Sequence, residues 1–190
     1  MQNNTENKYQ NKIFTIPNIL SFFRIFLIAP IIVLYSQQEF LGVLIVLIIS
    51  GISDIADGII ARKFNMISDF GKALDPIADK LTQLVVLICL ISRFPYITIL
   101  AIFLVIKELC AGITVLVSIK KTNAVKGAAW HGKLTTVVIY IAMVMHLVWY
   151  HIPPTASLIT IAVCVSVMTM SFILYLIRTV KAIRRGGYEN

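Results

Sequence analysis

Four aspartates lie close together in a sequence that has few acids elsewhere. Asp54 and Asp57 are three residues apart, and Asp75 and Asp79 are four residues apart. On a helix these spacings place the members of each pair on one face. With no cysteine or histidine nearby, four carboxylates suit Mg²⁺ or Mn²⁺ rather than zinc. Two such cations could clamp a phosphoryl group and its leaving oxygen, so the spacing indicates phosphoryl-transfer chemistry.

Small and basic residues accompany the acids. Gly58 and Ala61 continue the helix face of the first acidic pair, and Gly71 lies one turn before the second pair. The missing side-chain bulk leaves room for a nucleotide or a diphosphate to approach. Arg62 can bind phosphate oxygens in a bidentate manner. The short basic connection between the pairs predicts that the two helices are antiparallel neighbours.

A buried ion-pair network is the structural alternative to a metal site. In that case Arg62, Lys72 or Lys80 would neutralise some of the acids. Lys72 and Lys80 each directly follow a motif residue, so on a helix they should point about 100° away from it. We therefore expect both lysines to be poor partners for the residues that they adjoin.

The composition indicates a membrane protein. Of the 190 residues, 58% are hydrophobic and only 14% are charged, and 17 Lys+Arg against 9 Asp+Glu give a formal net charge of +8. Soluble domains are typically about 45–50% apolar and about 25% charged, so an ordinary soluble enzyme, a coiled coil and a disordered chain are excluded. The charges lie between apolar runs rather than on an exposed basic helix, which argues against nucleic acid as a partner.

The apolar runs predict an all-α, polytopic membrane fold. Each run is about as long as a membrane-spanning helix, and none alternates with the period of a strand. The six predicted spans are Ile16–Ser36, Phe40–Ala61, Phe70–Ile91, Tyr96–Ile119, Leu134–Tyr150 and Pro154–Thr179. They form one catalytic domain over residues 16–185, followed by a tail at 186–190. Residues 1–15 are expected to form either a short interfacial helix or a frayed terminus.

Basic residues in the connections are strongly asymmetric. The N-terminus, the second and fourth connections and the C-terminus contain Lys8, Lys12, Arg62, Lys63, Lys120, Lys121, Lys126, Lys181, Arg184 and Arg185. The other connections contain only Arg93. Positive residues mark the cytoplasmic side of short loops, so the pattern predicts six spans with both termini in the cytoplasm.

The acids and the small residues together form one continuous motif. It reads Asp54-x-x-Asp57-Gly58-x-x-Ala61-Arg62, eight residues, then Gly71-x-x-x-Asp75-x-x-x-Asp79. This motif resembles that of the CDP-alcohol phosphotransferases at all eight positions. The resemblance implies a membrane enzyme, with its active site near the cytoplasmic face, that transfers a phosphatidyl or similar group from a CDP-linked donor to an alcohol and releases CMP. It also implies a homodimer.

The same resemblance implies roles for single residues. Asp54, Asp57 and Asp75 would hold the first metal ion. Asp79 would complete the site of the second ion and act as general base for the acceptor hydroxyl. The residues expected to bind CDP are Asp57, Gly58, Ala61, Arg62, Ser68 and Gly71.

Two further stretches bear on the acceptor alcohol. Both are similar to segments of phosphatidylglycerophosphate synthases and of the related cardiolipin synthases. The two stretches read Ile16-Pro17-Asn18-Ile19-Leu20-Ser21-x-x-Arg24 and Leu74-Asp75-Pro76-x-Ala78-Asp79-Lys80. Both subfamilies use CDP-diacylglycerol, and their acceptors, glycerol 3-phosphate and phosphatidylglycerol, each carry a phosphate. An anionic acceptor requires cations, and the candidates are Arg24, Lys107 and Lys133.

The acceptor candidates leave two subfamilies open. Lys107 adjoins Glu108 where phosphatidylglycerophosphate synthases commonly have Arg-Glu, and a simple ion pair between the two is the alternative to a role in binding. Lys133 lies in a stretch similar to Gly-Lys-x-Lys-Thr with one lysine missing. We expect glycerol 3-phosphate to be the acceptor, with cardiolipin synthesis from phosphatidylglycerol as the alternative.

Other functional classes explain the sequence less well. A small transporter would also contain charges at membrane depth, but transporters usually repeat such features in two halves, and this motif occurs once. An aspartate-rich prenyltransferase groups its acids differently. A purely structural membrane protein would have no use for four costly intramembrane acids.

Overall fold

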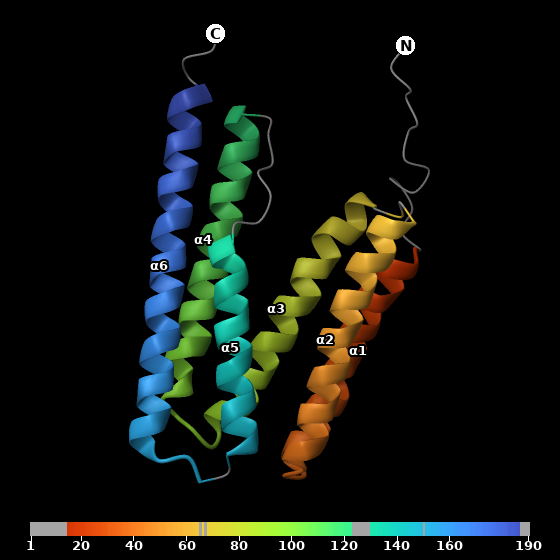
Figure 1. Cartoon of the computed structure of the whole chain (residues 1–190), viewed down its shortest axis with the longest axis vertical. Helices are drawn as coiled ribbons and strands as arrows, with labels where there is room; N and C mark the ends of the chain where they lie inside the picture. Colours follow the sequence, from red (N-terminus) through yellow and green to blue (C-terminus); the bar gives the residue numbers. More distant parts are fainter. Residues whose placement is uncertain (1–14, 65, 67, 123–129, 150, 187–190) are drawn as a thin grey trace. The chain divides into compact units, whose positions relative to one another are not determined.

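The computed structural model describes residues 15–64, 66, 68–122, 130–149 and 151–186. The described residues form six α-helices: α1 (Ile16–Ser36), α2 (Phe40–Lys63), α3 (Asp69–Ile91), α4 (Ile97–Thr122), α5 (Trp130–Val148) and α6 (Pro154–Gly186) (Figure 1). The predicted all-α class and the six helices are confirmed. Almost all of the expected interfacial segment and of the C-terminal tail lies outside the described residues.

The helix ends differ from the predicted span ends where polar residues continue a helix. α2 ends at Lys63 rather than Ala61, and α6 continues to Gly186 rather than ending at Thr179. Helical hydrogen bonding does not stop where the apolar residues stop, so a span prediction underestimates the helix length. α1 begins as predicted, because Thr15 accepts a hydrogen bond from the Asn18 backbone N–H (3.4 Å) and Pro17 suits the first turn.

Three of the described helices contain a stretch long and apolar enough to cross a membrane. These stretches are Ile16–Ser36, Phe40–Ala61 and Pro154–Ile177, and α5 holds a shorter apolar stretch, Leu134–Val148. Many large apolar side chains on these helices are exposed, among them Phe26 and Leu41 at 75% and 68%. In water such exposure would be unfavourable, so the helices belong in a bilayer.

The chain divides into two compact units, and the first is Met1–Cys89. Within it α1 packs along α2, to which it is joined by a tight turn (Figure 1). Gln38 in this turn has φ 63°, which few residues other than glycine and asparagine adopt readily. α3 contacts α1 through stacked Phe22 and Phe70 rings, 6.2 Å between centroids. The three helices therefore bring the motif and the first predicted span into one unit.

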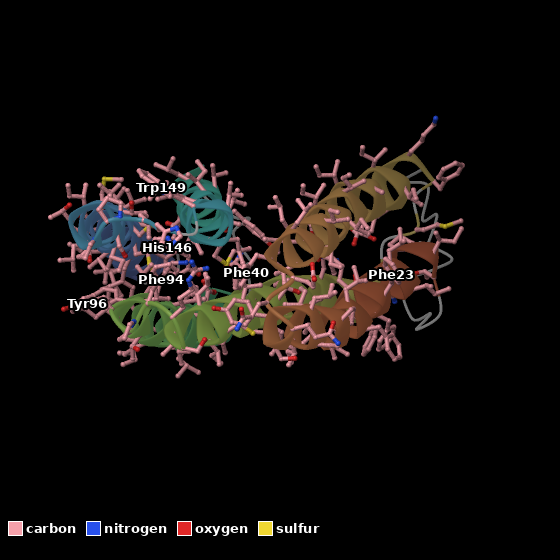
Figure 2. All side chains as sticks on the ribbon, turned by 90° about the horizontal axis from the view of Figure 1, so that it is seen from below. Phe23, Phe40, Phe94, Tyr96, His146 and Trp149 are labelled. Carbon is pink, nitrogen blue, oxygen red and sulfur yellow. The ribbon has the colours of Figure 1, made fainter. Side chains whose placement is uncertain are left out.

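The second unit, Leu90–Asn190, is built around α6, which packs against both α4 and α5. Near the end of α5 the buried His146 imidazole lies 2.9 Å from the Ser157 hydroxyl of α6 through Nε2. Its ring also contacts Phe94 edge to face, with 5.0 Å between centroids (Figure 2). These contacts tie the start of α6 to the end of α5 and to the connection before α4.

Candidate active site

Three of the four motif acids come together between the later part of α2 and the first turns of α3. Asp54 and Asp57 lie three residues apart on α2, and Asp75 lies on α3. One carboxylate oxygen from each lies within 4.8 Å of the other two. Asp57 is buried, whereas the side chains of Asp54 and Asp75 are 47% and 46% exposed. The group therefore has one buried and two accessible members.

A cation from α1 lies among these acids. The Arg24 guanidinium donates to Asp54 and Asp75, and its Nη2 lies 2.7 Å from Asp57 Oδ2. Nη2 also lies 3.3 Å from the hydroxyl of Ser21, one turn earlier on the same helix. Arg24 is only 2% exposed. The ion-pair alternative did not include Arg24, which pairs with these three acids. Of the cations that it named, Lys80 contacts the fourth acid, and the side chains of Arg62 and Lys72 lie outside the described residues.

The fourth acid, Asp79, has a different set of partners. Its two oxygens accept from Gln83 Nε2 at 3.2 and 3.1 Å, and Lys80 Nζ lies 3.2 Å from Oδ2. The expectation that Lys80 is a poor partner for Asp79 is therefore wrong. The Lys80 Cα–Cβ bond points away from Asp79, but the flexible four-carbon side chain lets the ammonium group reach back to the carboxylate. Asp79 lies one turn beyond Asp75, on the same face of α3.

A cavity of about 150 Å³ lies beside the acids. Of the six residues expected to bind CDP, five line it: Asp57, Gly58, Ala61, Ser68 and Gly71. The side chain of the sixth, Arg62, lies outside the described residues. α1 contributes Pro17, Asn18 and Ser21 to the lining. The predicted small residues thus border an empty volume, as room for a ligand requires.

Asn18 is a member of this site that the motif did not identify. Its Nδ2 donates to the Ser68 hydroxyl at 3.0 Å, and the same hydroxyl accepts the Gly71 backbone N–H at 3.0 Å. Asn18 and Ser68 are both 2% exposed. The sequence did contain a signal for this role, because Asn18 is a polar residue in an apolar span, six positions before Arg24. The network fixes the start of α3 against α1.

The predicted acceptor-binding residues are distributed over both units. Arg24 lies among the acids of the first unit. Lys107 belongs to the second unit, where its Nζ lies 2.7 Å from Glu108 Oε1, so the predicted alternative of a simple ion pair is formed. The Lys133 side chain lies outside the described residues. Binding of the acceptor by these residues stays a prediction.

The convergent acids fit a hard divalent cation. All three donors are carboxylate oxygens, which Mg²⁺ and Mn²⁺ prefer, and they come from two helices that hold them at a fixed separation. The Arg24 guanidinium contacts all three carboxylates, so their combined negative charge attracts a cation. The exposure of Asp54 and Asp75 leaves a route by which an ion could enter.

Comparisons with known proteins agree with this geometry. A Mycoplasma genitalium protein named CDP-diacylglycerol--glycerol-3-phosphate 3-phosphatidyltransferase is 35% identical over 150 residues, 68% of this chain and 63% of the relative. A Rickettsia typhi protein of the same name is 43% identical over 82 residues, 41% of this chain and 46% of the relative. A Streptomyces coelicolor protein named cardiolipin synthase (CMP-forming) is 42% identical over 89 residues, 44% of this chain and 41% of the relative.

These alignments cover only part of each relative, less than half in the last two. The family match is more extensive. The model of the CDP-alcohol phosphatidyltransferase domain matches residues 14–177, which include all three acids, Arg24 and Asp79. The chain therefore belongs to the CDP-alcohol phosphatidyltransferase family.

Proposed function

We propose that this protein is a phosphatidylglycerophosphate synthase. It transfers the phosphatidyl group of CDP-diacylglycerol to glycerol 3-phosphate and releases CMP. The observation that carries the proposal is the convergence of Asp54, Asp57 and Asp75 beside a cavity lined by the small motif residues. The names of the Mycoplasma and Rickettsia relatives support glycerol 3-phosphate as the acceptor.

We propose that residues 16–185 form one catalytic domain that crosses the membrane six times, with both termini and the active site on the cytoplasmic side. The three long apolar helices and the asymmetry of the basic residues support this topology. In this arrangement water-soluble CMP and glycerol 3-phosphate exchange with the cytoplasm while the acyl chains remain in lipid. The proposed assembly is a homodimer, on the family resemblance alone.

The proposed mechanism assigns separate tasks to the acids. Asp54, Asp57 and Asp75 would hold one divalent cation, and Asp79 would complete the site of a second; Mg²⁺ or Mn²⁺ suits both. When bound, these ions neutralise the donor diphosphate and stabilise the charge that develops on CMP. The cavity beside Gly58 and Gly71 would receive the cytidine diphosphate part of the donor.

Asp79 would accept the proton of the acceptor hydroxyl on one carboxylate oxygen. The hydroxyl oxygen then forms a bond to the phosphorus of the phosphatidyl group, and the bond from that phosphorus to the CMP oxygen breaks. CMP leaves with the electron pair of the broken bond. Gln83 and Lys80, which contact the Asp79 carboxylate, would orient it for proton transfer.

Gly71→Ala should impair donor binding. A methyl group at this position collides with Asn18 Oδ1 and lies 3.0 Å from Ser68 Oγ, so the cavity wall must move. We expect the KM for CDP-diacylglycerol to rise about tenfold, because the displaced wall would lose about 1.4 kcal/mol of the free energy of donor binding. Gly51→Ala is the matched control, because its added methyl group has nothing within 4 Å. Equal KM values for the two variants would contradict this assignment.

Lys133→Ala should raise the KM for glycerol 3-phosphate about tenfold with little change in kcat. An ammonium group that binds the acceptor phosphate contributes to binding of ground state and transition state alike. Lys63→Ala, which removes an exposed lysine, is the control. Initial rates at varied acceptor concentration measure the effect, and an unchanged KM in Lys133→Ala would remove this residue from the acceptor site.

The name of the Streptomyces relative favours cardiolipin synthesis as a second candidate. An acceptor screen separates the two. Purified protein with CDP-diacylglycerol and Mg²⁺ is offered glycerol 3-phosphate, phosphatidylglycerol, inositol phosphate or serine, and the lipid product is identified by mass spectrometry. Phosphatidylglycerophosphate from glycerol 3-phosphate alone supports the proposal. Cardiolipin from phosphatidylglycerol would make the protein a cardiolipin synthase, and no CMP release with any acceptor would contradict both candidates.

A further inference from the structure

Arg24 occupies the space between the three acids that are proposed to hold a divalent cation. Its two terminal nitrogens contact Asp54 Oδ1, Asp57 Oδ2 and Asp75 Oδ1. Its third nitrogen, Nε, is buried and has no hydrogen-bond partner in the described part of the chain. The guanidinium is therefore held almost entirely by the acids.

The guanidinium and a divalent cation compete for the same three carboxylates. Each carboxylate offers one oxygen within 4.8 Å of the other two, and Arg24 already contacts one oxygen of each, so little space remains for a second cation to contact all three. Two positive charges in this volume would also repel each other strongly, because the site is shielded from solvent on the side of Asp57 and Arg24. At least one contact of Arg24 must therefore be lost for the metal ion to bind.

We propose that Arg24 is a built-in cation that holds the acidic group together in the metal-free protein and is displaced from at least one of its carboxylates when the divalent ion binds. The inference rests on the proposed metal site. It gives α1 a positioning role, because without a cation the three acids would repel one another and the ends of α2 and α3 would separate.

Once displaced by the metal ion, Arg24 could also bind the substrate. Its side chain stays in the site because α1 is fixed there by Asn18, and the Ser21 hydroxyl lies 3.3 Å from Nη2. Ser21, Asp57 and Asp75, which Arg24 contacts, line the cavity, so a released guanidinium would remain next to it. Nε and any freed terminal nitrogen are then donors for a phosphate oxygen of the bound substrate.

Metal binding without substrate tests the proposal. Full-length protein in detergent is stripped with EDTA, and Mn²⁺ binding is followed at pH 8 by the electron paramagnetic resonance signal of the free ion. Arg24→Gln removes the competing charge, so its Kd for Mn²⁺ should be at least about tenfold lower than that of the wild type. Its unfolding temperature should fall in the metal-free state and recover when Mn²⁺ is added.

Two further variants keep the test decisive. Lys63→Gln removes an exposed positive charge at the end of α2, and solvent screening should keep its Kd within about twofold of the wild type. Arg24→Lys keeps the charge but has one nitrogen instead of a fork, so it bridges the acids less well and should bind Mn²⁺ about threefold more tightly. If Arg24→Gln does not fold, Arg24→Lys decides the question.

A Kd that is unchanged or higher in the Arg24 variants would overturn the proposal, because Arg24 would then assist metal binding or have no effect on it. A wild-type protein that binds no Mn²⁺ at all would instead contradict the proposed metal site, and with it the proposed function. The two failures are therefore distinguishable.

Discussion

Asp79→Asn should lower kcat at least about 1,000-fold and leave a Mn²⁺ site intact. Removal of a general base typically costs about 100- to 10,000-fold, and this carboxylate is also proposed to complete the second metal site. Asp54, Asp57 and Asp75 converge without it, so one metal ion should still bind. Asparagine is nearly isosteric, so the fold should survive. Turnover is measured as CMP release, and Mn²⁺ binding is measured on the same preparation.

Glu39→Gln is the matched control for this variant. It also replaces an acid by its amide, but at an exposed position that precedes α2 and lies outside the acidic group. Its turnover should equal that of the wild type. Wild-type turnover in Asp79→Asn would remove the residue from catalysis, whereas loss of all Mn²⁺ binding would show that the four acids act as one inseparable site.

Asp57→Asn should have an equally large effect for a different reason. Asp57 is the buried member of the convergent acids and also lines the cavity, so its loss affects both the metal ion and the donor. A catalytic metal ion contributes several kcal/mol to transition-state stabilisation, which corresponds to about 1,000-fold or more in rate. We expect kcat/KM to fall by at least this factor and the Kd for Mn²⁺ to rise at least about 100-fold.

The fold should tolerate Asp57→Asn, because Arg24 keeps Asp54 and Asp75 as partners and the new amide oxygen can still accept from Nη2. The unfolding temperature without metal is therefore the measurement that separates a lost ligand from a lost fold, and it should change by only a few degrees. Unchanged Mn²⁺ affinity in a folded Asp57→Asn protein would contradict its assignment as a ligand.

The sequence predicted that both acidic pairs would meet, and three of the four acids do, because the relevant rules are local; Asp79 lies outside this group and contacts Gln83 and Lys80. Spacings of three and four residues set a helix face, and a connection of only five residues between Lys63 and Asp69 keeps the end of α2 close to the start of α3. The helix ends were less predictable. Polar residues such as Lys63 continue a helix whose apolar stretch has already ended, so hydropathy marks the span and not the helix.

The partners of the acids could not be predicted in the same way. Arg24 is 30 and 51 residues from Asp54 and Asp75, and no spacing rule links positions so far apart. Its burial among the acids depends on how α1 packs against α2 and α3. The sequence did offer one unused signal, because Asn18, Ser21 and Arg24 lie at intervals of three residues and mark a polar face on an apolar helix.

The central claim is that this acidic site transfers a phosphatidyl group from CDP-diacylglycerol in a metal-dependent reaction. The most direct measurement follows CMP and lipid product together in EDTA-stripped protein supplied with CDP-diacylglycerol and glycerol 3-phosphate, before and after addition of Mg²⁺ or Mn²⁺. We predict no product without the ion, and equal amounts of CMP and phosphatidylglycerophosphate once it is added. Product formation in the stripped protein, or no CMP after either ion is restored, would contradict the claim.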